Sequence, residues 1–325
     1  MKIRLGNTGP EVFPIALGCM AMSGVYGASD ESESVATIRE AVERGISLID
    51  TGDFYAAGHN ELLVRRGIEG LREKVQLSVK FGVMRAPDGA PLGFDARPAS
   101  VKNFVTYSLT RLGVDVIDVY RPARLDPNVP IEETVGAIAD LVKAGYVRHV
   151  GLSEVGVETI RRAAKVHPIT DLQIEYSIVT RGPEAAIFPA LTQLGIGATL
   201  YGVLSRGLLT GSKVGGKGDN RAHMPRFSGE AGEHNAASIA RLHAFAAERA
   251  MTPAQLAVAW VLAKQPAFVP VIGARTRKQL QDALATLERP LSDNDVAAVE
   301  ALLPKDTVEG TRYPAAHMKQ LDSER

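Results

Sequence analysis

Eight short apolar segments alternate with amphipathic helical segments along the chain, and this rhythm constrains the fold more than any other feature of the sequence. The apolar segments predict strands at 15–18, 47–50, 75–80, 116–120, 148–152, 172–176, 196–201 and 268–272. Helices are predicted at 33–44, 61–68, 99–112, 131–143, 157–166, 184–193 and 277–287. Strands that alternate with helices form parallel βαβ units with right-handed crossovers. Eight such units indicate an α/β protein with the (β/α)₈ fold, a TIM barrel.

A doubly wound sheet is the alternative fold, because it is built from the same units. Its dinucleotide-binding form carries a glycine-rich turn, GxGxxG, directly after the first strand. Here the first strand is followed by Gly18-Cys19-Met20-Ala21-Met22-Ser23-Gly24, which does not match that turn. The barrel therefore remains the prediction, and a β-hairpin is expected at residues 2–14, before the first barrel strand.

The alternation is interrupted once, between the seventh and eighth strands. The loop from Ser205 to Gly232 is rich in Gly, Lys and Arg, and a loop of this length is typical of a lid or a disordered segment. Two extra helices are predicted after it, at 236–250 and 253–264. The polar, aperiodic segment after Pro304 is expected either to lie over the barrel mouth or to fray.

Composition and charge exclude several classes of protein. The 37 Lys and Arg residues equal the 37 Asp and Glu residues, so the basic surface of a nucleic-acid-binding protein is not expected. Cys19 is the one cysteine, which excludes an internal disulfide and fits a reducing compartment. No apolar run approaches the roughly 18 residues of a membrane-spanning helix. A soluble cytoplasmic protein is expected, with a single domain over residues 1–325 and a small molecule as its partner.

Titratable side chains gather at the carboxyl ends of the second and third strands. Asp50, Asp53 and Tyr55 end or follow one strand, and Lys80 ends the next. In parallel α/β folds, this end of the strands carries the ligands and the chemistry. An ammonium beside a phenol lowers the pKa of that phenol, and a carboxylate can hold the ammonium in place. The pattern predicts a proton-donating tyrosine at this end of the barrel.

Several motifs resemble those of the aldo-keto reductases, in order from about residue 3 to about residue 290. They are Leu48-Ile49-Asp50-Thr51-Gly52-Asp53-Phe54-Tyr55, Asn60-Glu61, Val79-Lys80, Leu152-Ser153, Gln173-Ile174-Glu175-Tyr176-Ser177, Tyr201-Gly202-Val203-Leu204-Ser205-Arg206-Gly207-Leu208-Leu209 and Val271-Ile272-Gly273-Ala274-Arg275. The chain is most similar to the microbial pyridoxal-reductase-like and general aldehyde-reducing members of that family. The resemblance implies a barrel that binds NADPH across its carboxyl-terminal mouth and reduces aldehydes or activated ketones to alcohols.

By position, the resemblance assigns catalytic roles to three residues. Tyr55 is the general acid that donates a proton to the carbonyl oxygen while hydride arrives from the nicotinamide. Lys80 lowers the pKa of the phenol, and Asp50 holds Lys80. The fourth catalytic residue of the family is usually a histidine, and here that position is Ala123, which offers no hydrogen-bond donor from its side chain.

Three residues are candidates for the missing donor at the oxyanion or for contact with the substrate. Arg121 and Arg124 flank Ala123 in the sequence, and His59 follows Tyr55 closely. Because side chains alternate along an extended strand, Arg121 shares the face of Ala123 and Arg124 does not.

The resemblance also implies a set of cofactor contacts. Arg275, at the start of the last helix, is expected to bind the 2′-phosphate of NADPH together with free amides of that helix. Tyr201 is expected to stack on the nicotinamide, and Ser153 and Gln173 to bind its carboxamide. Lys213 and Lys217 in the long loop either touch the pyrophosphate or are simply solvated. The cofactor-binding candidates are Gly18, Cys19, Met20, Asp50, Ser153, Gln173, Tyr201, Gly202, Leu204, Arg206, Gly207, Gly273, Arg275 and Gln279.

An alternative function is an NADPH-binding regulatory or redox-sensing barrel with weak or lost turnover. Ala123 favours this alternative, whereas the presence of Asp50, Tyr55 and Lys80 favours the enzyme. No metal site is expected, since no His, Asp or Glu residues have the spacing of metal ligands.

Overall fold

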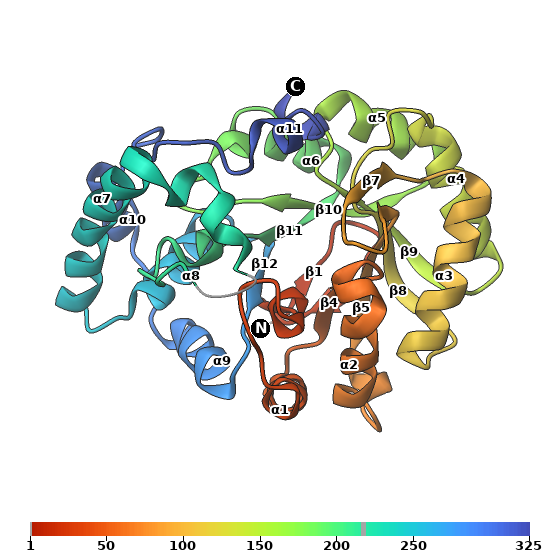
Figure 1. Ribbon diagram of the computed structural model, residues 1–325, viewed down its shortest axis with the longest axis horizontal. Coiled ribbons are helices and arrows are strands. Elements are labelled where there is room, and N and C mark those ends of the chain that lie inside the picture. Colours follow the sequence, from red (N-terminus) through yellow and green to blue (C-terminus); the bar gives the residue numbers. More distant parts are fainter. Residues whose placement is uncertain (1, 216–218) are drawn as a thin grey trace.

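The computed structural model describes residues 2–215 and 219–325, and its central feature is a closed barrel of eight parallel strands (Figure 1). The strands are β3 (Ala16–Gly18), β4 (Leu48–Gly52), β5 (Gln76–Phe81), β8 (Ile117–Pro122), β9 (Val147–Ser153), β10 (Ile169–Glu175), β11 (Gly197–Tyr201) and β12 (Val269–Gly273). Each strand pairs with the next in chain order, and β12 pairs with β3 to close the ring. The predicted (β/α)₈ barrel is confirmed.

The helices surround the barrel on its outside (Figure 1). They are α1 (Glu31–Glu43), α2 (His59–Gly67), α3 (Pro98–Leu112), α4 (Ile131–Lys143), α5 (Val157–Val166), α6 (Ile187–Leu194), α8 (Pro253–Lys264) and α9 (Arg277–Leu284). The bounds of α4, α5 and α8 are those predicted. Helix α8 has a clear start signal, a capping box in which Thr252 and Gln255 satisfy each other's backbone amides.

The predicted N-terminal hairpin covers the amino end of the barrel. Strand β1 (Ile3–Arg4) pairs antiparallel with β2 (Glu11–Val12), and the turn between them packs directly against β10 and β11. Gly6 has a positive φ of +58°, and a Cβ on it would lie 2.7 Å from the backbone nitrogen of Gly197. Because the hairpin fills this end, the other end of the barrel is left for the site.

Three parts of the fold differ from the sequence prediction. A second hairpin, β6 (Val83–Arg85) with β7 (Pro91–Phe94), follows β5, and its short strands lack apolar alternation. Helix α10 (Asp293–Leu302) begins with a capping box at Ser292. Helix α7 (Gly229–Glu248) begins within the segment predicted as loop.

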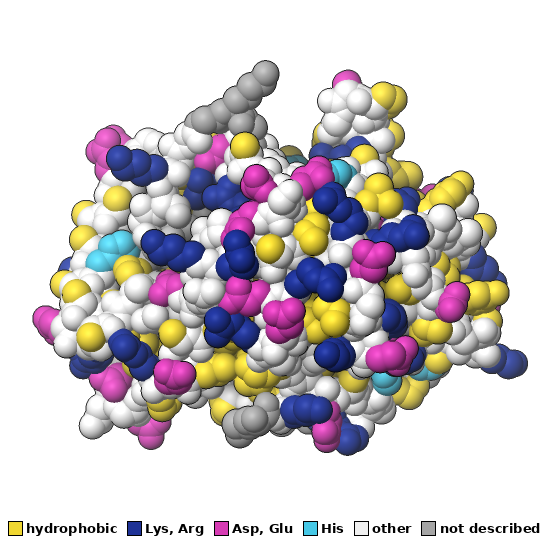
Figure 2. Space-filling model, turned by 90° about the horizontal axis from the view of Figure 1, so that it is seen from below, with side chains coloured by type: hydrophobic (Ala, Val, Ile, Leu, Met, Phe, Trp, Pro, Cys, Tyr) yellow, Lys and Arg dark blue, Asp and Glu magenta, His cyan; other side chains and the backbone are white. Residues whose placement is uncertain are grey.

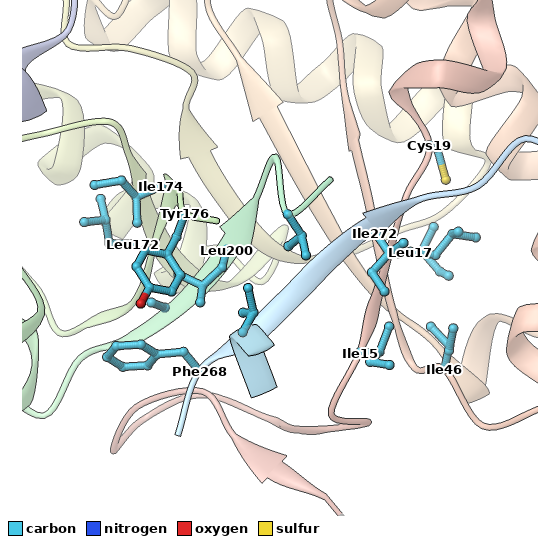
Figure 3. Close-up of a cluster of buried hydrophobic side chains, with 14 of the residues drawn as sticks. Ile15, Leu17, Cys19, Ile46, Leu172, Ile174, Tyr176, Leu200, Phe268 and Ile272 are labelled. Carbon is cyan, nitrogen blue, oxygen red and sulfur yellow. The ribbon is translucent and has the colours of Figure 1, made fainter. Parts of the chain in front are cut away.

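The core consists of aliphatic side chains from both faces of the barrel strands and from the helices (Figure 3). Leu17 and Ile272 are register partners on β3 and β12. Tyr176 stacks on Trp260 of α8 with ring centroids 5.4 Å apart, which joins the barrel to the helical layer. Cys19 is fully buried among these residues, and burial raises the pKa of its thiol.

The segment after α10 lies over the barrel mouth rather than fraying. It contains α11 (Ala315–Met318) and a 3₁₀ turn at Asp322–Glu324, and in Figure 1 it runs in blue from α10 towards α5 and α6. Asn235 of α7 anchors its start through reciprocal hydrogen bonds with the backbone of Glu309. Asp322 anchors its end by accepting a 2.8 Å hydrogen bond from the amide of Gly156, just before α5.

The surface carries both signs of charge. On the face shown in Figure 2, Lys and Arg side chains are interspersed with Asp and Glu, as expected for a chain with no net charge. Within the described ranges, no helix has the length and apolarity required to cross a membrane.

The interior of the barrel holds an ion pair below the mouth. Arg121 of β8 and Asp171 of β10 are both fully buried, with Nη1 of the arginine 3.0 Å from Oδ2 of the aspartate. Arg121 also donates to the hydroxyls of Ser78 and Thr199, so this one guanidinium ties together four strands, β5, β8, β10 and β11.

Removal of one partner leaves the other charge buried and unpaired. We expect Asp171→Ala to lower the free energy of unfolding by roughly 3–5 kcal/mol, measured by urea denaturation. Lys102→Ala is the matched control, because it breaks an exposed pair with Asp140 and is expected to cost less than about 1 kcal/mol. Equal losses of unfolding free energy in the two variants would show that the buried pair contributes no more to stability than the exposed pair.

Candidate functional site

The centre of the site is a buried ion pair between the ends of β4 and β5. Nζ of Lys80 lies 2.5 Å from Oδ1 of Asp50, and both side chains are about 6 % exposed. The parallel register places Asp50 beside Ser78, whose hydroxyl donates to Oδ2 of the aspartate at 2.8 Å. The structure thus brings together the carboxylate and the ammonium that the sequence placed at neighbouring strand ends.

Gln173 of β10 completes this cluster from across the barrel. Its Oε1 accepts a 2.9 Å hydrogen bond from Lys80, and its Nε2 donates to Asp50 at 2.8 Å. The Gln173 amide therefore orients the ion pair, instead of being free for a carboxamide as predicted. Ser153 of β9 is different: its buried hydroxyl has no hydrogen-bond partner among the described residues.

Tyr55 lies above the ion pair, in the 3₁₀ turn that follows β4 (Tyr55–Gly58). Its ring centroid is 5.2 Å from Nζ of Lys80, and its exposed fraction is 8 %. Burial, followed by the charge of Asp50, raises the pKa of Tyr55 well above its usual value, and Arg124 opposes this shift. The pKa of this phenol is therefore raised and not lowered as expected, and the ammonium of Lys80 beneath the ring is engaged by Asp50 and Gln173.

Ala123, at the position of the missing histidine, offers no side-chain hydrogen-bond donor. Ala123 is buried, and its amide donates to the carbonyl oxygen of Phe81. Arg121, one of the three candidates for the missing donor, belongs to the ion pair inside the barrel and is fully buried, so this candidate is wrong. Arg124 is half-buried and donates from Nη1 to the carbonyl oxygen of Ala123 at 2.6 Å.

His59 is also engaged within the protein. Its Nδ1 lies 3.1 Å from the hydroxyl of Ser23, and its Nε2 lies 2.9 Å from a carboxylate oxygen of Glu31. Both ring nitrogens therefore have partners, which corrects the expectation that His59 faces a substrate.

The opposite side of the mouth is built around Glu154, directly after β9. This residue has a positive φ of +53° and a fully buried side chain. Its carboxylate accepts from Arg312 at 2.5 and 3.0 Å and from the hydroxyl of Tyr201 at 2.8 Å. Burial alone would raise the pKa of Glu154, but the charge and hydrogen bonds of Arg312 lower it to about 2. Glu154 is therefore ionised at neutral pH.

Arg312 and Tyr313 of the C-terminal segment contact two predicted cofactor residues. The hydroxyls of Tyr313 and Tyr201 are 3.1 Å apart, and the guanidinium of Arg206 lies 4.4 Å from the Tyr313 ring centroid. Arg206 also forms a 2.7 Å ion pair with Glu175. Sequence reasoning missed Arg312 and Tyr313, since they follow the last predicted helix in a stretch without periodicity.

Arg275 lies before α9, near the loop that follows β3. Its Nη1 donates to the carbonyl oxygens of Tyr26 and Ala28, and its amide donates to Gln279. Among the residues described, no carboxylate forms an ion pair with Arg275. The remaining donors of its guanidinium are therefore available to an anion, and Thr276 caps the helix beside it.

The long loop is tied to the same region. Arg221 pairs with Asp219 at 2.7 Å and donates to the carbonyl oxygens of Arg206 and Lys213, and Asp219 forms an isolated bridge with Tyr26. Lys217, the other lysine considered for the pyrophosphate, lies outside the described residues.

The remaining predicted cofactor residues divide into two groups. Gly18 and Gly273 are register partners at the ends of β3 and β12, and Gly273 is exposed. Cys19 was expected to bind the cofactor, and this expectation is corrected. Its side chain is buried, and its amide and carbonyl oxygen are hydrogen-bonded within the protein, to Asp50 and to Asn60. Partly buried residues around the mouth are Met20, Gly202, Leu204 and Gly207.

Comparisons with known proteins agree with this architecture. The model of the aldo/keto reductase family matches residues 14–304. A probable aldo-keto reductase of Glycine max is 39% identical over 318 residues, which is 96% of this chain and 91% of that protein. The chain belongs to the aldo/keto reductase family, and its activity is that of an oxidoreductase.

Two solved structures share the fold over nearly the whole chain. A glycerol dehydrogenase from Gluconobacter oxydans has a TM-score of 0.83 and 29% identity, covering 93% of this chain and 94% of that chain. An aldo-keto reductase from Bacillus halodurans, in its holo form, has a TM-score of 0.76 and 26% identity, covering 93% and 95%.

Asp53, two residues before Tyr55, is a buried acid beside the site. Its amide donates to the carbonyl oxygen of Lys80, and the residue is 8 % exposed. Burial, followed by the charge of Glu61, raises the pKa of Asp53 from 3.8 to about 7, and Arg111 opposes this shift. The folded protein therefore favours the protonated form of Asp53.

This shift destabilises the fold at high pH, because ionisation of Asp53 is easier in the unfolded chain. The cost begins above the unfolded pKa of 3.8, grows as pH rises, and is constant above about 7. We expect Asp53→Asn to raise the free energy of unfolding at pH ~8 by roughly 3–4 kcal/mol, with a much smaller gain at pH ~4. The exposed Asp115→Asn is the control, and a gain for Asp53→Asn that is independent of pH would contradict the assignment.

Proposed function

We propose that the protein is an NADPH-dependent reductase of aldehydes or activated ketones, with Tyr55 as the general acid. The observation that carries this proposal is the buried cluster of Asp50, Lys80 and Gln173 directly beneath Tyr55. A cluster of this kind is costly to bury, and its position at the barrel mouth gives it access to ligands.

The residues divide the chemistry as follows. NADPH, when bound, supplies the hydride. The phenol of Tyr55 is protonated at neutral pH, so it can donate its proton to the carbonyl oxygen as negative charge develops there. The phenolate that remains lies near the positive charge of Lys80, and Asp50 with Gln173 keeps that ammonium in place. Proton transfer by a positioned side chain contributes roughly 10²–10⁴ in rate.

Two features of the chain fit NADPH in particular. The buried, unpartnered hydroxyl of Ser153 fits one end of a carboxamide at the inner part of the mouth. Arg275, without an ion pair among the described residues, fits the 2′-phosphate at the outer end. Charged hydrogen bonds from a guanidinium suit phosphate in both geometry and charge.

A regulatory barrel that binds NADPH with little turnover is the second candidate. Ala123 favours it, because the carbonyl oxygen lacks one hydrogen-bond donor that the family usually provides. The contacts of Tyr313 with Tyr201 and Arg206 favour it as well, since they cover residues that the cofactor is expected to use. A regulatory barrel does not require the cluster of Asp50, Lys80 and Gln173 beneath Tyr55, and we therefore prefer the enzyme.

Replacement of the phenol tests the enzyme directly. We expect Tyr55→Phe to lower kcat for an aromatic aldehyde by about 10²–10⁴, because the proton donor is lost. The dissociation constant of NADPH, measured by fluorescence titration, is expected to stay within about twofold of the original protein. Unchanged turnover in Tyr55→Phe would reject Tyr55 as the general acid. Absent turnover in both proteins, while NADPH still binds, would support the regulatory candidate.

Replacement of Arg275 tests the choice of cofactor. We expect the original protein to bind NADPH roughly tenfold to a hundredfold more tightly than NADH, since a charge-assisted hydrogen bond contributes about 1.5–3 kcal/mol. Arg275→Ala is expected to remove most of this difference by weakening NADPH binding alone. The neighbouring Lys278→Ala serves as the control for loss of a positive charge on α9, and equal affinities for both cofactors in the original protein would contradict the proposal.

A further inference from the structure

At the barrel mouth, three carboxylates, those of Glu154, Glu175 and Glu324, pair with guanidinium groups. Glu154 is paired with Arg312 at 2.5 Å, and Glu175 with Arg206 at 2.7 Å. Arg226 lies 3.9 Å from Glu175, and Glu324 adds a second carboxylate to Arg312 at 2.7 Å. Arg124 is the remaining cation, and within the described part of the chain it forms no ion pair.

Arg124 directly follows Ala123 after β8, the strand that pairs with the end of β5 where Lys80 lies. Its positive charge acts to lower the pKa values of Tyr55, Lys80 and Glu154. Its one hydrogen bond within the described residues goes to the neighbouring carbonyl oxygen of Ala123 and uses only Nη1. The other donors of the planar group are left for a ligand.

The small side chain at position 123 leaves the β8 side of the site to Arg124. A histidine there would contact the carbonyl group of a substrate, whereas alanine adds neither bulk nor a hydrogen-bond donor. A half-buried cation without a carboxylate partner gains most from an anion that arrives with the substrate, because the desolvation cost is then shared.

We propose that Arg124 binds a carboxylate carried by the substrate, so that the preferred substrates are aldehydes or ketones with an anionic group. This inference rests on the proposed reductase function. It assigns Arg124 to substrate selection, and the carbonyl group itself remains with Tyr55. A bidentate contact between guanidinium and carboxylate matches the geometry of both groups.

Two aldehydes of nearly equal shape test the proposal. The first is para-carboxybenzaldehyde, and the second is para-carbamoylbenzaldehyde, in which an amide replaces the carboxylate. We expect the kcat/KM of the original protein to be roughly tenfold to a hundredfold higher for para-carboxybenzaldehyde than for para-carbamoylbenzaldehyde, as charged hydrogen bonds of this type allow. A ratio near one, or a preference for the amide, would overturn the proposal without any variant.

Arg124→Met then identifies the residue responsible. We expect this variant to lose the discrimination by lowering kcat/KM for the carboxylate alone, and Arg124→Lys to retain part of it. Arg44→Met, which removes an exposed charge on α1, is the matched control. An equal loss on both aldehydes would show that Arg124 acts on the carbonyl oxygen or on the fold, and would overturn the proposal.

A binding measurement separates this proposal from the proposed function. The carboxylate product, para-hydroxymethylbenzoate, is titrated by calorimetry into the original protein and into Arg124→Met, each saturated with NADP. Weaker binding to the variant by about tenfold or more supports the anion site, even if Tyr55→Phe shows that the reductase assignment is wrong. Unchanged binding in the variant rejects the anion site, whatever the activity.

Discussion

The structure depends on the buried ion pair between Asp50 and Lys80. Both charges are removed from water, which costs several kcal/mol per ion unless every remaining donor and acceptor is satisfied. Ser78 and Gln173 supply the hydrogen bonds, and they come from strands on opposite sides of the barrel. Closure of the barrel therefore brings together the hydrogen bonds that offset the desolvation cost of the ion pair. A sheet that stayed open would leave the Lys80 ammonium without Gln173, and the phenol of Tyr55 without an ordered cation beneath it.

A second layer of charge lies below the first. Arg121 reaches Ser78 and Thr199, which contact the Asp50 cluster, so the two ion pairs share hydrogen-bond partners. Above them, Glu154 is buried in a left-handed backbone conformation and is held by Arg312. The interior of this barrel thus carries polar networks at three levels, whereas its helical faces are held by ordinary apolar packing.

Apolar periodicity was sufficient to predict the barrel, since strands and helices of this type have few other arrangements. It also placed Asp50, Tyr55 and Lys80 at one end. The depth of each side chain within the barrel was not predictable. Alternation puts Arg121 and Ala123 on the same face of the strand, but Arg121 lies in the interior and Ala123, two residues further along, lies at the mouth. The direction of the pKa shift of Tyr55 depends on burial, which sequence spacing does not give. The contacts of Arg312 were hidden because they join residues far apart in an aperiodic segment.

The pairing of Arg312 with Glu154 spans 158 residues of chain. Closure of the barrel also joins distant parts of the chain, since Val271 of β12 pairs with Ala16 of β3. Arg312 and Glu154 are both buried, so removal of either partner would leave an unpaired charge inside the protein. The shape of the pocket is thus tied to a segment outside the barrel, whereas the cluster beneath Tyr55 is built from barrel strands alone.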